Sequence, residues 1–449
     1  MVLQHGANEA VAALVGPKLH QNLEDQPQTI VTTYECSSQK FYSEAIDLRE
    51  RSRFPAVMDL ITTTESLYRL CTSLAGESFI TVDTEFMRES TYWPDLCLIQ
   101  VAGEEVNGLI DPLAPGIDLA PFFALMNDPN VLKVFHAARQ DIEIMVHRAG
   151  IVPHPVFDTQ IAAMVCGFGD QVGYEAIVRK LAKAQIDKSS RFTDWSRRPL
   201  SEKQLAYALA DVTHLRVVYE ALKQELDRTG REHWLREEMD ILTNPATYRT
   251  EPEDAWKRIK VRLRSKKQMG VLVEVSAWRE REAREKNVPR SRVLKDDAIS
   301  ELAVQMPQTR EALNQLRALP KGMSTSRVGD AILKAVAAGL SADPKTLPPL
   351  EDGRDDMSDA AQAAAEVLKL ALKVVCEQEG IAPKLVASSS DIDAIAERDD
   401  ADVHVMHGWR RELFGDLALA IKRGEAVIGF EGGRVRVLPA IREMKAAAE

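Results

Sequence analysis

Runs of β-branched and apolar residues, which favour β-strands, are concentrated between residues 60 and 246 and almost vanish after Thr247. Three of these runs, Phe79–Val82, Leu96–Val101 and Val131–Phe135, have the length and composition of buried strands. Patterns with helical spacing alternate with them. The first half of the chain therefore predicts an α/β domain whose mixed sheet is flanked by helices.

The second half predicts bundles of amphipathic helices. Between Ala255 and Ala337 the helical pattern is interrupted at Gly270, Pro289, Pro307 and Pro320, where we expect breaks. We expect an N-terminal extension at residues 1–57, the α/β domain at 58–246, a helical bundle at 247–338, a linker at 339–359, a second bundle at 360–439 that includes a small hairpin around Gly432–Gly433, and a tail at 440–449.

The first 57 residues have weak periodicity, with isolated apolar residues among Gln, Glu and Ser. We expect a flexible extension. The regular pattern that starts at Met58 raises the hypothesis that the native chain begins there.

Length and composition indicate a globular chain of several domains. The 449 residues are about three times the length of a typical domain, and 45% of them are hydrophobic and 28% charged. There is no run of roughly 18 apolar residues, so we expect no membrane association. Five scattered cysteines without a C-x-x-C pair indicate a reducing compartment, which we interpret as the cytoplasm: Cys36, Cys71, Cys97, Cys166 and Cys376.

The net charge of −11 means that any binding of nucleic acid must depend on local basic patches or on metal ions. The strongest basic patch lies between Lys257 and Lys267, with seven basic residues and no acid. Its functional interpretation is a surface that follows phosphates, with Lys257, Arg258, Lys260, Arg262 and Arg264 as candidate contacts. A solvated helix face is the alternative.

Two carboxylates stand at the end of the first predicted strand. Asp83 and Glu85 are separated by one residue, so their side chains project from the same face, with Val82 and Thr84 on the other. Burying two like charges side by side is unfavourable unless a cation lies between them. Taken alone, however, such a pair is more often a helix cap and a solvated rim residue.

Two further candidates follow along the chain. Asp141 lies where a strand passes into a helix, a position that favours an anion and from which it could point toward Asp83 and Glu85. Ser201 begins a later helix with an S-x-x-Q capping box. In that helix Tyr207 and Asp211 are four residues apart and only about 40° apart around the axis, which places them on one face.

These residues, in this order, resemble the three exonuclease motifs of the DEDD superfamily in its tyrosine-containing branch. Within that branch the chain resembles the ribonuclease D family over roughly residues 58–246. Further motifs support the resemblance: Thr91–Pro94, Leu98–Gln100, Leu109–Pro112, Asp158–Gln160, Asp187–Ser189 and Thr193–Trp195. The resemblance implies an RNase H-like exonuclease fold.

The resemblance also implies the chemistry. Asp83, Glu85, Asp141 and Asp211 would hold two divalent ions, Mg²⁺ or Mn²⁺, whose charge of +4 balances the four carboxylates. Tyr207 would orient the attacking water, since a phenol with a pKa near ~10 is a poor base at neutral pH. The implied reaction is 3′–5′ hydrolysis of RNA that releases nucleoside 5′-monophosphates, with tRNA precursors as the implied substrates and no obligate protein partner evident.

Three neighbouring residues have more ordinary interpretations. Phe86 could stack on the terminal base, but a core aromatic is about as probable. We expect His136 to be a packed, hydrogen-bonded histidine without a catalytic role, because Mg²⁺ disfavours imidazole. Asp158 has the position of a helix N-cap.

Both helical bundles resemble HRDC domains, small helical bundles that are linked to nucleic-acid binding. The first resemblance is carried by Trp278–Glu280 and Val288–Arg290, and the weaker second one by His407–Leu413. Two alternatives stay open at this point: a noncatalytic RNA-binding adaptor that keeps the fold, and a DNA 3′–5′ exonuclease.

Overall fold

The computed structural model describes residues 60–350 and 357–440. These residues form two compact units, which we describe separately. The larger contains residues 60–162 and 173–350, and the smaller contains residues 163–172 and 357–440. The expected extension at 1–57 lies outside the described residues, as does nearly all of the expected tail.

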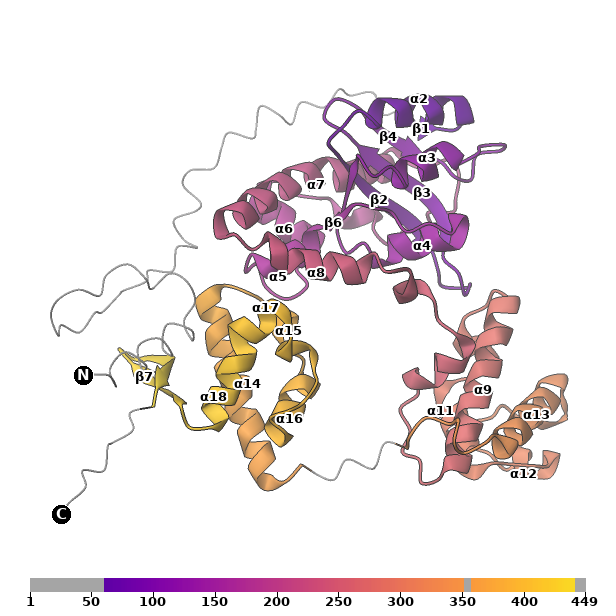
Figure 1. Ribbon diagram of the computed structural model, residues 1–449. Helices are drawn as coiled ribbons and strands as arrows, with labels where there is room; N and C mark the ends of the chain where they lie inside the picture. The colour runs from indigo at the N-terminus through magenta and orange to yellow at the C-terminus, as the bar shows by residue number, and fades with distance from the viewer. Residues whose placement is uncertain (1–59, 351–356, 441–449) are drawn as a thin grey trace, which may run out of the picture. The chain divides into compact units, whose positions relative to one another are not determined.

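The larger unit begins with a six-stranded mixed sheet in the order β1-β4-β3-β2-β5-β6 (Figure 1). Strand β3 pairs antiparallel with both β2 and β4. The other pairs, β1 with β4, β2 with β5 and β5 with β6, are parallel. The three predicted strands are confirmed as β2, β3 and β5. The strands are β1 (Leu60–Ile61), β2 (Phe79–Met87), β3 (Asp95–Ala102), β4 (Asn107–Ile110), β5 (Leu132–Phe135) and β6 (Val156–Asp158).

Strand β2 is central but only partly paired on one side. It pairs with β3 from Thr81 to Met87, and with β5 only from Phe79 to Thr81. Its second half therefore has an open edge toward β5, where another element can approach. The register with β3 shifts between Glu85 and Phe86, as at a β-bulge, a feature that often re-aims side chains next to active sites.

Helices pack around this sheet, as the periodicity predicted. The longest, α7, begins at the predicted Ser201 capping box and ends at Gly230, which has a φ of 68°. It buries Val212, Leu215 and Leu222. The helices are α2 (Thr64–Leu74), α3 (Ala120–Met126), α4 (Arg139–Ala149), α5 (Thr159–Val165), α6 (Tyr174–Leu181), α7 (Glu202–Thr229) and α8 (Glu232–Leu242).

A helical bundle follows in the same unit. Helices α9 and α13 cross where Gly270 faces Gly339, and a Cβ at Gly270 would lie 2.3 Å from the Gly339 carbonyl oxygen. The predicted break at Gly270 is thus wrong, because this glycine serves a close helix crossing inside α9. Helix α13 also continues into the expected linker. The helices are α9 (Lys266–Glu285), α10 (Arg290–Val293), α11 (Asp296–Gln305), α12 (Arg310–Asn314) and α13 (Arg327–Ser341).

The basic patch from Lys257 to Lys267, which we call the basic segment, is not helical throughout. The 3-10 helix η5 (Pro252–Arg258) includes only the first two residues of this segment, and residues 259–264 have no regular structure. Buried or half-buried Ile259, Val261 and Leu263 alternate with exposed basic residues. The prediction of a helix for this stretch is wrong. Its apolar residues recur at every second position, so one side of an extended segment packs against the bundle core.

A buried polar cluster joins this bundle to the loop between β2 and β3. Glu280 on α9 is fully buried, and Arg290 donates to its two carboxylate oxygens at 2.5 and 2.7 Å. The Tyr92 hydroxyl donates to Glu280 and accepts from Arg284 at 3.1 Å and from Arg290 at 2.8 Å. Asn287 Oδ1 accepts the backbone N–H groups of Tyr92 and Trp93, each at 3.1 Å. We call these residues the Glu280 cluster.

The Glu280 cluster gives a first prediction. Glu280→Gln should lower the free energy of unfolding at neutral pH by about 3 kcal/mol, because it removes the fully buried carboxylate and leaves the partly buried Arg290 charge without its partner. Burial alone would raise the pKa of Glu280, but hydrogen bonds from Arg290 and Tyr92 outweigh it and bring the pKa to about 2. That value is below the unfolded pKa of about 4.3, so the stabilisation is complete above that pH and is lost as pH falls toward 2.

Denaturant unfolding of the full chain tests this, with Glu285→Gln, an exposed position on the same helix, as the control. The control should change the free energy of unfolding by less than about 0.5 kcal/mol. Equal free energies of unfolding for Glu280→Gln and Glu285→Gln would contradict the stabilising ion pair between Glu280 and Arg290.

The smaller unit combines helices with the predicted hairpin. Strands β7 and β8 pair antiparallel around Gly432 and Gly433, whose φ values of 56° and 78° suit a tight hairpin turn. Within this unit the Ala382 N–H donates to the Met164 carbonyl at 3.1 Å. The elements are α14 (Asp359–Glu379), α15 (Pro383–Val386), α16 (Ser389–Glu397), α17 (Gly408–Arg410), α18 (Asp416–Lys422), β7 (Ala426–Glu431) and β8 (Arg434–Pro439).

Candidate active site

The predicted carboxylate pair lies on the face of β2 that α7 covers. Thr81 shares this face with Asp83 and Glu85, and its hydroxyl donates to the Val212 carbonyl of α7 at 2.8 Å. Asp83 and Glu85 are both partly buried. The alternation along β2 thus directs both carboxylates toward the helix that carries Asp211.

Helix α7 supplies the next two groups. Asp211 is 5% exposed and accepts a hydrogen bond from Tyr207, one helical turn earlier. The buried Tyr174 hydroxyl donates to the Asp211 carbonyl at 2.5 Å and fixes the backbone there. The other carboxylate oxygen, Asp211 Oδ1, is buried without a hydrogen-bond partner. A buried carboxylate oxygen in this state needs a cation or a proton donor.

Asp141 approaches β2 from the opposite face at the open edge. It lies in the first turn of α4, is 6% exposed, and accepts a hydrogen bond from the Thr84 hydroxyl. The turn before α4 is held by Asp158, whose carboxylate accepts the N–H groups of Ala137 at 3.0 Å and Ala138 at 2.8 Å. Asp158 also accepts the Gln160 N–H at 2.8 Å, which confirms its predicted capping of α5.

The four carboxylates interact electrostatically. Burial, and then the charge of Asp211, raises the pKa of Asp83 well above its usual range. Burial raises the pKa of Glu85 to about 10, with further contributions from Asp83, Asp211 and Asp141. Burial also raises the pKa of Asp141, together with the charge of Asp83, and raises that of Asp211 to about 7. In the absence of a cation this cluster holds protons at neutral pH.

The donor set fits hard divalent cations. It offers carboxylate oxygens only, and one of them, Asp211 Oδ1, has no other partner. Within residues 60–350 and 357–440, no three His, Cys, Asp or Glu side chains are placed so that together they could hold a metal ion. Asp141 and Asp211 are instead hydrogen-bonded to Thr84 and Tyr207.

The sequence analysis missed one cation close to this cluster. Among the charges acting on Glu85 and Asp211, Arg191 is the one that lowers both pKa values. Arg191 is exposed, its guanidinium lies 5.1 Å from the ring centroid of Phe192, and Phe192 is 90% exposed. A detectable signal was present: an Arg–Phe pair separates two of the motifs quoted above, Asp187–Ser189 and Thr193–Trp195.

The loop that carries Arg191 is anchored on both sides. On one side the Asp187 carboxylate accepts the backbone N–H of Ser189 at 2.9 Å. On the other side the Gln204 amide donates to the Thr193 hydroxyl at 3.1 Å. Trp195 is 2% exposed, and its ring centroid lies 6.1 Å from that of Tyr207. The loop is thereby fixed beside the carboxylates, with its tip free to meet a ligand.

The other predicted residues have different surroundings. His136 Nδ1 lies 2.9 Å from the Thr159 hydroxyl, as expected for a packed histidine, and Phe86 is half-buried. Lys257 pairs with Asp254 at 2.7 Å, and the other basic candidates, Arg258, Lys260, Arg262 and Arg264, are exposed. The structure thus groups the four carboxylates with Tyr207, whereas the basic candidates belong to the segment before α9.

Comparisons with known proteins identify two parts of the chain. The family model for a 3′-5′ exonuclease matches residues 58–227, and that for an HRDC domain matches residues 268–336. Ribonuclease D of Nitrobacter hamburgensis is 52% identical over 378 residues, which cover 84% of this chain and 98% of the relative. Ribonuclease D of Granulibacter bethesdensis is 47% identical over 390 residues, 87% of this chain and 98% of the relative.

A solved structure is also similar. The crystal structure of Escherichia coli RNase D, described as an exoribonuclease involved in structured RNA processing, has a TM-score of 0.72 and 29% identity. The match covers 82% of this chain and 99% of that one.

In the described residues, no helix is both long and apolar enough to cross a membrane.

Proposed function

The chain belongs to the ribonuclease D family of hydrolytic 3′–5′ exoribonucleases, and we propose that its carboxylate cluster and Tyr207 remove 3′-terminal nucleotides from RNA as 5′-monophosphates. The observation that carries this proposal is the meeting of four buried or half-buried carboxylates from β2, α4 and α7 with a tyrosine hydroxyl. Acid groups so placed are unfavourable unless they serve a bound cation.

Asp83, Glu85, Asp141 and Asp211 would hold two divalent ions, Mg²⁺ or Mn²⁺, as hard oxygen ligands. When bound, such ions activate a water molecule and stabilise the departing oxygen of a phosphodiester. Thr84 fixes the Asp141 carboxylate at the open edge of β2 through its hydroxyl, and Tyr174 fixes the backbone of Asp211. These two residues act by positioning the carboxylates.

Tyr207 would orient the attacking water. Burial, followed by the charge of Asp211, raises the pKa of Tyr207 far above neutrality, so its phenol stays protonated. A protonated hydroxyl can donate and accept hydrogen bonds but cannot act as a base at pH 7. Its contribution is therefore the orientation of water in line with the scissile bond.

Arg191 and Phe192 would contact the substrate end. An exposed guanidinium beside the carboxylates can form charge-assisted hydrogen bonds to a phosphate, and an exposed ring can stack on a base. Phe86, next to Glu85, is a second candidate for stacking.

We predict that Arg191→Gln raises the KM for RNA about tenfold, the size expected for the loss of one charge-assisted hydrogen bond. Steady-state kinetics on a short single-stranded RNA would measure it. Arg197→Gln, an exposed position on the same loop, is the matched control and should keep the KM within about twofold. Equal KM values for the two variants would remove Arg191 from the substrate site.

The substrates we propose are structured RNA precursors, with the 3′ ends of tRNA precursors as the first candidates, by analogy with the family. The basic segment would bind their backbone through Lys257, Arg258, Lys260, Arg262 and Arg264. Four of these five side chains are exposed without a described ion pair, and an extended segment presents alternate residues on one side. We also propose a cytoplasmic location, because Cys71, Cys97 and Cys376 are free thiols in the part of the chain that the structure describes.

The test uses RNA and DNA of one sequence, labelled at the 5′ end, with Mg²⁺ or with EDTA. We expect RNA to shorten one nucleotide at a time from its 3′ end with Mg²⁺ and to stay intact with EDTA. RNA binding without hydrolysis in either buffer would indicate a noncatalytic adaptor. Preferential shortening of DNA would indicate a DNA exonuclease.

A further inference from the structure

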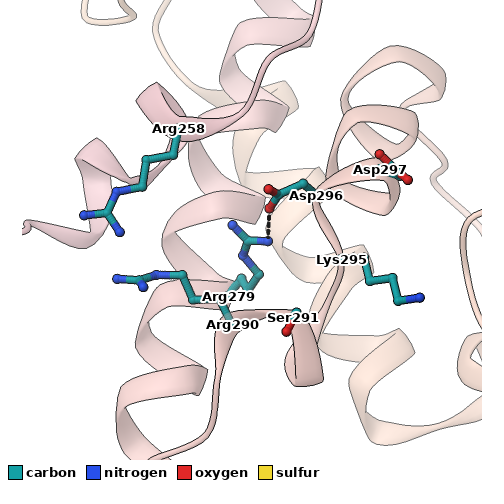
Figure 2. Close-up of a pocket in the computed structure, with 7 residues that line it drawn as sticks. All are labelled: Arg258, Arg279, Arg290, Ser291, Lys295, Asp296 and Asp297. Atoms are coloured by element: carbon teal, nitrogen blue, oxygen red, sulfur yellow. Dashed lines mark hydrogen bonds and ion pairs between the residues drawn. The ribbon is translucent and has the colours of Figure 1, made fainter. Parts of the chain in front are cut away.

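A polar pocket of about 440 Å³ lies in the larger unit, at the start of the basic segment, where Arg258 contributes to its lining (Figure 2). Its lining comes from η5, α9, α10 and the beginning of α11. Four cationic and two acidic side chains take part: Arg258, Arg279, Arg290, Lys295, Asp296 and Asp297. We call it the arginine pocket.

Two of the arginines are held in place by hydrogen bonds to the protein. Arg279 is 3% exposed and donates to the Leu294 carbonyl at 2.9 Å and to Asp296 at 2.5 Å. Arg290 is fixed by its two hydrogen bonds to Glu280. Their orientations are therefore set before any ligand arrives, which lowers the entropic cost of binding.

In the described part of the chain, some of the N–H donors in the pocket have no acceptor that is charged or, for Arg279 Nε, no acceptor at all. Arg258 is exposed, and its described contact is a 3.3 Å hydrogen bond to the Thr250 hydroxyl. The guanidinium groups of Arg258 and Arg290 extend to the same side in Figure 2, whereas that of Arg279 reaches Asp296. Arg279 Nε is buried without an acceptor. Guanidinium groups gathered in this way match the oxygens of a phosphate.

The acidic residues narrow the choice of ligand. Asp296 and Asp297 add two negative charges to the lining, so a doubly charged phosphomonoester would be repelled more than a singly charged diester. The local excess of positive charge is small once the Arg279–Asp296 and Arg290–Glu280 pairs are counted. A phosphodiester within a strand fits this balance better than free phosphate.

The arginine pocket is also tied to the catalytic strand. Arg290 donates to the Tyr92 hydroxyl at 2.8 Å, and Tyr92 lies in the loop that follows β2, five residues after Met87. The Glu280 cluster thus fixes the pocket relative to the strand that carries Asp83 and Glu85. A phosphate bound there would hold the body of an RNA at a set position from the site of cleavage.

We propose that the arginine pocket binds a backbone phosphodiester in the body of the RNA substrate, away from the 3′ end that is being hydrolysed. This rests on the proposed function and extends it, because it assigns a second contact through which long RNA is distinguished from short RNA. Arg258 is the exposed contact of the pocket, and Arg290 is the contact fixed by Glu280.

The test measures RNA affinity of the full chain in an Asp83→Asn background, so that binding is seen without hydrolysis. Arg258→Gln should weaken binding of a long RNA about tenfold and leave the affinity for a trinucleotide unchanged. Arg262→Gln, in the basic segment but outside the pocket, should weaken the long RNA about twofold. Arg317→Gln, an exposed arginine elsewhere in the same bundle, should have no effect.

Three results would overturn the proposal. The first is an equal loss for Arg258→Gln and Arg262→Gln, which would reduce the pocket to general surface charge. The second is an equal loss for the long RNA and the trinucleotide. The third is competition by inorganic phosphate that Arg258→Gln abolishes while RNA affinity stays unchanged, which would make free phosphate the ligand. Failure of the wild-type chain to hydrolyse any RNA would instead refute the proposed function.

Discussion

Asp83→Asn is expected to lower the turnover of RNA by at least about 10³-fold while leaving the fold intact. The substitution removes a charge from the cluster but little volume, so packing of β2 against α7 is preserved. It would also remove one of the four ligands proposed for the divalent ions. Single-turnover hydrolysis with saturating Mg²⁺ measures the effect, and circular dichroism checks the fold.

A second measurement distinguishes a specific loss of turnover from a general loss of folding. In EDTA, Asp83→Asn should raise the thermal unfolding midpoint, because burial and the charge of Asp211 raise the pKa of Asp83 and an acid with a raised pKa destabilises the fold at neutral pH. Glu89→Gln, an exposed carboxylate just after β2, should change neither turnover nor stability. Full activity of Asp83→Asn would refute the metal assignment.

Tyr207→Phe is expected to lower kcat about 10²-fold, with little change in the KM for RNA. The ring still fills its place near Trp195, but the hydroxyl that would orient water is lost. Because the phenol stays protonated, the pH profile of the remaining activity should keep the wild-type shape between pH 6 and pH 9, taken as roughly the working range.

The control for this prediction is Tyr68→Phe, a tyrosine on α2 that is 63% exposed. It should match the wild type in kcat. A Tyr207→Phe variant with wild-type kcat would show that the hydroxyl has no part in the reaction, and a shifted pH profile would indicate that it titrates as a base.

Local patterns in the sequence were sufficient to predict several of the elements and the faces on which the proposed site residues lie. The β-branched runs predicted β2, β3 and β5, and the S-x-x-Q pattern predicted the start of α7. Alternation along β2 put Asp83 and Glu85 on one face, and the i to i+4 spacing put Tyr207 beside Asp211. Each of these predictions depends on a few neighbouring residues, where backbone geometry decides the outcome.

Features that depend on distant segments were not predictable in the same way. The contact of Thr84 with Asp141 requires the open edge of β2, which is set by the short length of β5. Gly270 was taken for a helix break because its partner, Gly339, is far along the chain. The Glu280 cluster joins residues almost 200 positions apart, and no local pattern contains that information.

The most direct test of the carboxylate cluster as a metal-dependent nuclease centre is anomalous scattering from crystals of the full chain soaked in Mn²⁺ with a nucleoside 5′-monophosphate. The account predicts two peaks, about 3.5–4 Å apart, among the carboxylates of Asp83, Glu85, Asp141 and Asp211. A well-ordered map with no peak between these side chains would contradict it.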